Sequence, residues 1–232
     1  MCTVVIDVAE LGGSRLLAIR DEDPARPWDS LGEWWSETHP GVIGIRDRRA
    51  GGAWLAADLK NGRLAVLLNR ADVPGLAIDA AVSRGALPLD SVAGRSVPAS
   101  PRMHGFNLLE VTADAARITS WDGETLRETP VSAGVHMIAH DELDDPTTPR
   151  IARWLPEFRA RPARNDDWEE SWVELLRESA ALDPTDDRAL IRDNRPHGYP
   201  TESLLYCLAE IGHDDMRVDE MPLPRSAGRS TH

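Results

Sequence analysis

The sequence contains little lysine, little cysteine and no long hydrophobic run. Lys60 is the one lysine among 26 basic residues, and Cys2 and Cys207 are the two cysteines in 232 residues. Two cysteines cannot build a disulfide framework, and no cysteine and histidine have the spacing of a zinc site. No apolar stretch approaches the roughly 20 residues that span a bilayer, so we expect no integral membrane association. We also expect no bound metal and no cofactor.

Basic charge is scarce relative to acidic charge. The net charge is −13, from 26 basic and 39 acidic side chains. A nucleic-acid-binding protein needs a basic face to neutralise phosphates, so this balance argues against a nucleic-acid partner and against an anionic membrane surface. The first ten residues lack a basic segment and include Asp7 and Glu10, which is atypical of a secretory signal. We therefore expect a cytoplasmic protein.

Hydrophobic residues make up 41% of the chain, enough to build a sizeable core. No internal repeat or clean linker divides it. We predict a single domain over residues 1–221 and a loose tail over residues 222–232. The oligomeric state is not predictable from the sequence.

β-Branched residues and apolar runs separated by turn residues predict short strands over the first two thirds of the chain. The predicted strands are residues 3–7, 15–19, 41–45, 53–57, 63–68, 106–112, 116–121, 126–129 and 135–139. Helices are predicted at 76–84, ended by Gly85, and at 150–158 and 166–182, whereas 90–102 is typical of a loop or a frayed helix. Residues 202–211 suit either a buried strand or a helix, and propensity favours the helix. This pattern predicts an α+β fold of stacked sheets with helices outside.

Cys2 is the residue with the most chemical potential. If Met1 is removed, Cys2 carries a thiol nucleophile and an α-amine in one residue, and a free α-amine with a pKa of about 7.7–8.0 can accept the thiol proton at neutral pH. Alternatively, Cys2 is an ordinary residue of the first strand.

The predicted hairpin around Gly12 and Gly13 brings Arg20 and Asp21 close to Cys2. Arg20 could then lower the pKa of the thiol, and Asp21 could hold the amine. The alternative is a solvated charge cluster.

Two asparagines are candidate oxyanion donors, since Asn69 ends one predicted strand and Asn107 begins another. Strand-end hydrogen bonding is the alternative role for both. His136 and His140 are four residues apart, but in a strand that spacing is about 13 Å, which argues against a shared metal.

Several motifs resemble the Asn-Arg-Asp-Glu (NRDE) family, also called the transport and Golgi organisation family. The start resembles the family's Met-Cys strand and its Leu-x-x-Ala-Asn-Arg-Asp-Glu motif. Further ordered matches are Arg26-Pro27, Gly51-Gly52-Ala53-Trp54, the strand ending at Asn69, Ser83-Arg84-Gly85 and Gly105-Phe106-Asn107-Leu108.

The resemblance implies an N-terminal-nucleophile hydrolase-like fold, a four-layer αββα sandwich with two stacked antiparallel sheets. It implies a strand rather than a helix at 202–211. In related amidases an N-terminal cysteine attacks an amide carbonyl while an arginine and an aspartate position it. Arg20 and Asp21 are similar to that pair, and Asn69 would fall near the oxyanion donor.

The sequence departs from the family pattern at three positions. Ile19 replaces the asparagine of the family's Asn-Arg-Asp-Glu motif, His140 stands where the family has an amide side chain, and Glu202 stands where a hydrolase arginine is expected.

The sequence supports two hypotheses about function. The first is an amidohydrolase acting on a linear amide through Cys2. The second is a non-catalytic protein on the same fold that binds or carries a small ligand such as haem or lipid. Either would have a small molecule as its partner.

Overall fold

The structure is a computed structural model and describes residues 2–71 and 81–223. The chain opens with the predicted hairpin, formed by β1 (Thr3–Val8) and β2 (Ser14–Glu22). Thr3 pairs with Ile19 and Val8 with Ser14. Gly12 and Gly13 both have positive φ at the turn, a conformation that glycine adopts without steric cost.

This hairpin is the centre of a five-stranded antiparallel sheet with the order β10-β1-β2-β11-β12. Its other strands are β10 (Gly134–Ile138), β11 (Glu202–Ile211) and β12 (Met216–Pro222). A seven-stranded sheet runs in the order β3 to β9. Its strands are β3 (Trp28–Gly32), β4 (Val42–Asp47), β5 (Ala53–Asp58), β6 (Arg63–Asn69), β7 (Phe106–Val111), β8 (Ala116–Trp121) and β9 (Leu126–Val131). Every strand pairing in the two sheets is antiparallel.

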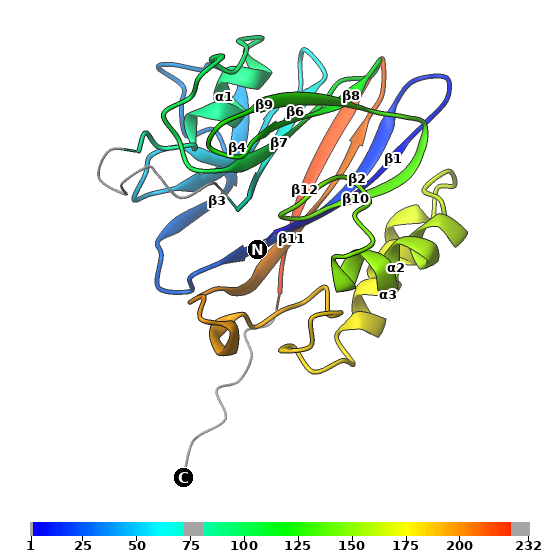
Figure 1. Cartoon of the computed structure of the whole chain (residues 1–232). Helices are drawn as coiled ribbons and strands as arrows, with labels where there is room; N and C mark the ends of the chain where they lie inside the picture. Colours follow the sequence, from blue (N-terminus) through cyan, green and yellow to red (C-terminus); the bar gives the residue numbers. More distant parts are fainter. Residues whose placement is uncertain (1, 72–80, 224–232) are drawn as a thin grey trace.

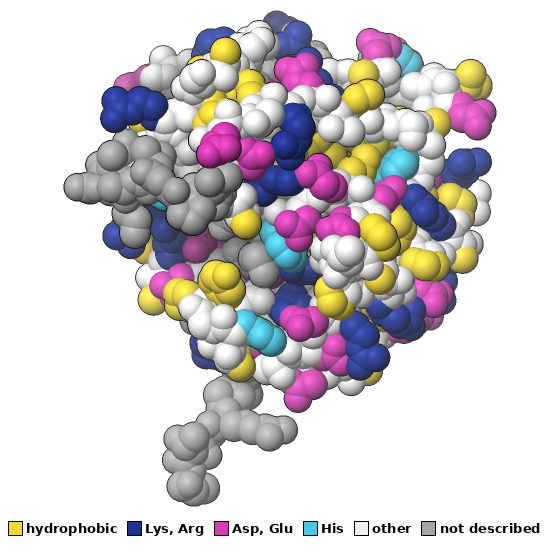
Figure 2. All heavy atoms as spheres, viewed as in Figure 1, with side chains coloured by type: hydrophobic (Ala, Val, Ile, Leu, Met, Phe, Trp, Pro, Cys, Tyr) yellow, Lys and Arg dark blue, Asp and Glu magenta, His cyan; other side chains and the backbone are white. Residues whose placement is uncertain are grey.

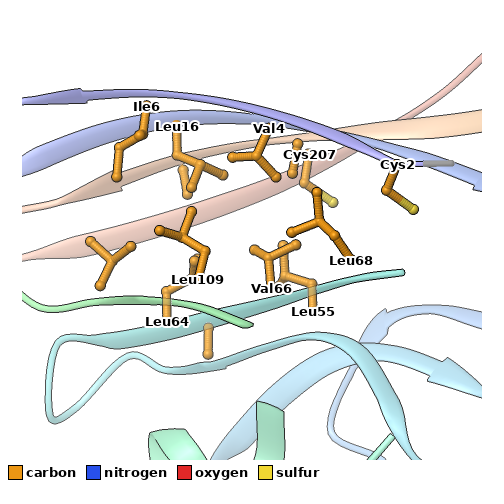
Figure 3. Close-up of a cluster of buried hydrophobic side chains, with 14 of the residues drawn as sticks. Cys2, Val4, Ile6, Leu16, Leu55, Leu64, Val66, Leu68, Leu109 and Cys207 are labelled. Carbon is orange, nitrogen blue, oxygen red and sulfur yellow. The ribbon is translucent and has the colours of Figure 1, made fainter. Parts of the chain in front are cut away.

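The two sheets pack face to face around the largest core cluster. Because side chains alternate along a strand, Val4 and Ile6 of β1 point toward the other sheet. They belong to one cluster with side chains of the seven-stranded sheet, and Figure 3 shows Val4 facing Val66 and Leu55. The inter-sheet core is therefore apolar along the length of β1, and Cys2 lies at one end of it.

Helices cover both outer faces (Figure 1). Val5 points away from the inter-sheet core and packs with Trp154 of α2 (Pro149–Ala160) and Trp172 of α3 (Trp168–Ser179). On the other side, α1 (Ala86–Val92) packs on the seven-stranded sheet. The order of layers is thus helix, sheet, sheet, helix, which confirms the expected α+β sandwich. No helix in the described residues is long and apolar enough to cross a membrane.

The strands fit the predictions better than the first helix does. The predicted strand centres are confirmed, and β11 is the strand that the family resemblance implied. Of the predicted helix at 76–84, residues 76–80 lie outside the described residues, and 81–84 are not helical. The assignment of Gly85 as a helix end was wrong, because it immediately precedes α1. The last residues of α1 enter the stretch that was expected to be a loop or a frayed helix. Gly85 packs against Gly52 so closely that a Cβ on Gly52 would meet its backbone at 2.4 Å.

The two helices after the strand region are shifted by a few residues from their predicted ends. Helix α2 tolerates Pro156 in its interior, and α3 begins one position after Asp167 rather than after Asp166. The domain boundary at residue 221 stays a prediction. Pro222 belongs to β12, and the expected tail lies outside the described residues beyond 223.

The surface carries charges of both signs. Figure 2 shows acidic and basic side chains interspersed over one face. The excess of acidic charge is therefore not gathered into one patch on that face.

Candidate active site

A cleft of about 510 Å³ opens between the two sheets at the end of the inter-sheet core. The five-stranded sheet contributes Cys2, Arg20 and Asp21 to its lining, and the seven-stranded sheet contributes Trp54 and Asn69. Four of the five predicted site residues therefore line one cleft. They come together because the first hairpin places positions 2 and 20 side by side and β6 ends opposite them.

Cys2 has its side chain directed toward the opposite sheet (Figure 3). The residue is 7% exposed, and its Sγ donates a weak hydrogen bond to the backbone oxygen of Asp21 at 3.7 Å. Burial raises the pKa of the Cys2 thiol, and the positive charge of Arg20 offsets only part of that shift. The sulfur is therefore a protonated thiol at neutral pH, and it needs a base before it can act as a nucleophile.

Arg20 is a buried cation on the cleft side of β2. Its side chain is 2% exposed, lies 5.5 Å from the ring centre of Trp28, and donates from Nη2 to Glu22 at 3.3 Å. Its Nη1 is buried and has no hydrogen-bond partner among the described residues. A guanidinium nitrogen left in this state can donate to an oxygen of a bound molecule.

The side chain of Asp21 lies on the helix-facing side of β2, since neighbouring residues of a strand alternate. Its Oδ1 accepts a hydrogen bond from Ser203 Oγ at 2.5 Å, and its Oδ2 accepts one from Asn194 Nδ2 at 3.4 Å. Its backbone carbonyl faces Cys2. The carboxylate of Asp21 therefore lies on the helix-facing side of the sheet, and its backbone carbonyl accepts the hydrogen bond from Cys2.

A second buried arginine, which the sequence did not single out, stands near the same carboxylate. Arg150 at the start of α2 is 2% exposed and donates from Nη1 to Thr3 Oγ1 at 3.1 Å. Burial lowers the pKa of Arg150 to about 10, and the charge of Asp21 is the main influence that opposes this shift. The guanidinium remains charged at neutral pH and supplies a cation from the helix layer.

His140 contacts this arginine. Its Nδ1 lies 3.4 Å from Arg150 Nη2, and its Nε2 lies 3.1 Å from Asp141. Burial, and then the charge of Arg150, lower the pKa of His140. The ring is therefore a neutral imidazole at pH 7, with one N–H to donate.

Glu202 does not enter the cleft lining. It lies on β11 opposite Glu22, and Arg195 approaches its carboxylate at 3.5 Å. Burial is the main cause of the raised pKa of the Cys2 thiol, and among the carboxylates it is that of Asp21 that adds to this shift.

The two candidate asparagines have different surroundings. Asn69, at the exposed end of β6, lines the cleft. Asn107 is fully buried and does not line it. Its Oδ1 accepts from Ser120 at 2.7 Å, and its Nδ2 donates to the backbone oxygen of Asp141 at 2.9 Å. Both ends of this amide are engaged, so Asn107 holds the segment that carries His140 instead of facing a ligand.

Trp54 was not predicted as a site residue although it lies in the Gly-Gly-Ala-Trp match. It is 7% exposed, and its Nε1 is buried and has no hydrogen-bond partner among the described residues. A tryptophan after paired glycines is as consistent with a core position as with a site, so no signal in the sequence separates the two. In the structure its indole N–H is a second candidate donor in the cleft lining.

A family model described as transport and Golgi organisation 2 matches residues 1–203. The chain belongs to the transport and Golgi organisation 2 family. The match includes every described residue of the cleft lining, and also Arg150. No curated protein matches the sequence. In this member of the transport and Golgi organisation 2 family, no group of three or more His, Cys, Asp or Glu residues in the described parts could hold a metal ion.

Proposed function

We propose that this protein is an amidohydrolase that cleaves a linear amide through an acyl-Cys2 intermediate after removal of Met1. The observation that carries the proposal is that a buried cysteine at position 2, a buried arginine and an exposed asparagine line one cleft of about 510 Å³. That volume lies in the range of small-molecule sites, about 300–1,000 Å³. The lining includes buried N–H groups that can meet a developing negative charge.

In the proposed reaction, the α-amine of Cys2 accepts the thiol proton and the sulfur attacks the carbonyl carbon of the amide. The tetrahedral intermediate carries its negative charge on oxygen. When the carbon–nitrogen bond breaks, the α-ammonium gives its proton to the leaving amine. Water then attacks the thioester carbon while the α-amine accepts one water proton. The carbon–sulfur bond breaks, the α-ammonium returns that proton to the sulfur, and the products are a carboxylic acid and the free thiol with its amine restored.

The charged residues have separate roles in this proposal. Asp21 and Arg150 form an electrostatic pair beside the first strand, and the Asp21 carboxylate can hold the α-amine in place. Arg20 keeps a positive charge near the sulfur as it ionises. Asn69 is the proposed oxyanion donor, with the unpartnered N–H groups of Arg20 and Trp54 as additional donors.

The alternative, a binding protein without catalysis, uses the same cleft but fits haem or lipid poorly. Four arginines and three acidic residues are among its described lining residues. A long acyl chain or a porphyrin face needs a mostly apolar wall. No observation in the described residues favours this alternative over hydrolysis.

We expect Asn69→Ala to lower kcat by about 100-fold with little change in KM, because one donor to the oxyanion is lost. The measurement is hydrolysis of a panel of fluorogenic N-acyl-aminocoumarins of increasing acyl length by protein whose mass confirms Met1 removal. Asn61→Ala is the matched control, since Asn61 lies in the β5–β6 turn and its side chain donates to Asp58, away from the cleft lining that the structure describes. An equal loss in both variants, or no hydrolysis by the unaltered protein, would argue against the proposed role.

A further inference from the structure

A second cavity lies at the far end of the five-stranded sheet from Cys2. Its volume is about 330 Å³, and the two hairpins of that sheet and the link between α2 and α3 line it. The residues used below are Asp7 and Arg15 from the first hairpin, Glu210 and Asp215 from the β11–β12 hairpin, and Arg164 from the link. We call it the Asp7 cavity. Nothing in the proposed hydrolysis uses it.

Asp7 is a buried carboxylate that faces this cavity. On β1, Val5 packs in the helix-facing core and Ile6 in the inter-sheet core, so alternation directs Asp7 toward the helix layer. The residue is 4% exposed, and neither carboxylate oxygen has a hydrogen-bond partner among the described residues. A buried carboxylate that lacks donors is costly, and a ligand that donates to it removes that cost.

The obvious internal partner of Asp7 is engaged elsewhere. Arg15 lies directly opposite Asp7 across the hairpin. Its guanidinium donates to Glu210 at 2.8 Å and to the backbone oxygens of Ala163 at 2.8 Å and Asn165 at 3.0 Å. Arg15 and Glu210 therefore neutralise one another, so Arg15 is not available as a charged partner of Asp7. The backbone N–H of Ala163 acts on the Asp7 carboxylate but carries no net charge, and the carboxylate keeps accepting capacity for a cationic donor.

The remaining charges favour a cationic donor. Burial raises the pKa of Asp7, and the Ala163 backbone amide, Arg164, Arg15 and His136 on β10 offset only part of the shift. With Arg15 paired to Glu210, the charged groups left around the cavity are Asp7, Asp215 and Arg164. A metal ion needs more ligands than one carboxylate, and the described residues contain no group of three candidate ligands.

We propose that the Asp7 cavity binds a small organic ammonium ion, whose N–H groups donate to the Asp7 carboxylate. The ionised carboxylate only accepts hydrogen bonds, and an ammonium group only donates them. The volume of about 330 Å³ limits the ligand to a small amine. The Asp7 cavity shares no described lining residue with the Cys2 cleft, so amine binding there does not depend on amide hydrolysis.

The test is an NMR titration of the isotope-labelled full chain with butylammonium chloride. Butanol at matched ionic strength is the uncharged control ligand. We expect saturable shifts of the backbone amides of Ala163, Arg164 and Gly212 with the amine and none with the alcohol. Asp7→Asn keeps the shape of the side chain and removes its charge, and it should weaken binding at least about tenfold.

Asp215→Asn is the matched variant, because it removes the same charge from an exposed position of the cavity wall. It should change the affinity by less than about threefold, since exposed charges are screened. In the unaltered protein, lowering the pH until Asp7 is protonated should also weaken binding, which tests the carboxylate without any substitution. The proposal is overturned if the amine causes no saturable shift, or if Asp7→Asn binds it as tightly as the unaltered protein.

Discussion

Replacing Cys2 with alanine is expected to abolish amide hydrolysis, with a loss of at least about 1,000-fold in kcat/KM. The variant removes the sulfur, which is the one protein atom that forms a covalent bond to the substrate in the proposed mechanism. Alanine is small enough for Met1 to be removed as before, so the α-amine is retained. The measurement is the rate of aminocoumarin release by the purified variant, with circular dichroism as the check on folding.

Cys207→Ala is the matched control. Cys207 is also a buried cysteine of the inter-sheet core, but it lies on β11 and does not line the cleft. Burial raises the pKa of its thiol, and unlike Cys2 it has no α-amine of its own to accept the thiol proton, so we expect an inert packing residue. This variant should keep its activity within about twofold. Full activity in Cys2→Ala, or equal losses in the two variants, would contradict the assignment of the nucleophile.

Replacing Trp172 with alanine is expected to destabilise the fold by about 3–5 kcal/mol. Trp172 is fully buried and packs edge to face against Phe158 and Trp168, at centroid distances of 5.3 and 5.4 Å. Its Nε1 also donates to the backbone oxygen of Arg161 at 2.8 Å. The substitution leaves a large cavity between α2 and α3 and removes a contact that fixes their link.

Thermal or urea unfolding measures this effect, and the midpoint temperature should fall by roughly 10 °C. Trp34→Ala is the control. Trp34 is 38% exposed, and Arg46 Cζ lies 4.8 Å from the centre of its ring. Its replacement should lower the free energy of unfolding by about 1 kcal/mol or less. If both variants unfold at the same denaturant concentration, the helix-facing core is not arranged as described.

The sequence predicts the sheets well because their strands are long apolar runs separated by turns. Gly12 and Gly13 allow the first turn, and the register that follows brings Arg20 beside Cys2. By contrast, β3 follows Pro27 directly and β12 has one buried residue, Val218, so neither has an apolar pattern that identifies it. Their pairing with β4 and β11 is decided by neighbouring strands.

The sequence predicts those residues of the site that are close together along the chain. Cys2, Arg20 and Asp21 meet because one short hairpin joins them, whereas Arg150 reaches Thr3 from a helix almost 150 positions later. No spacing rule connects those two residues. Asn107 illustrates the opposite error, because a strand-end amide is as able to brace a loop as to face a ligand, and here it braces the loop.

The central claim is that Cys2 works as an amino-terminal nucleophile, and the intact mass of the protein from its native host tests it most directly. A thiol whose pKa is raised by burial needs a base, and the proposed base exists only when Met1 is absent. The account predicts a mass lower than that of the full sequence by one methionine residue. A mass that retains Met1 would contradict it, because Cys2 would then have no α-amine to accept the thiol proton.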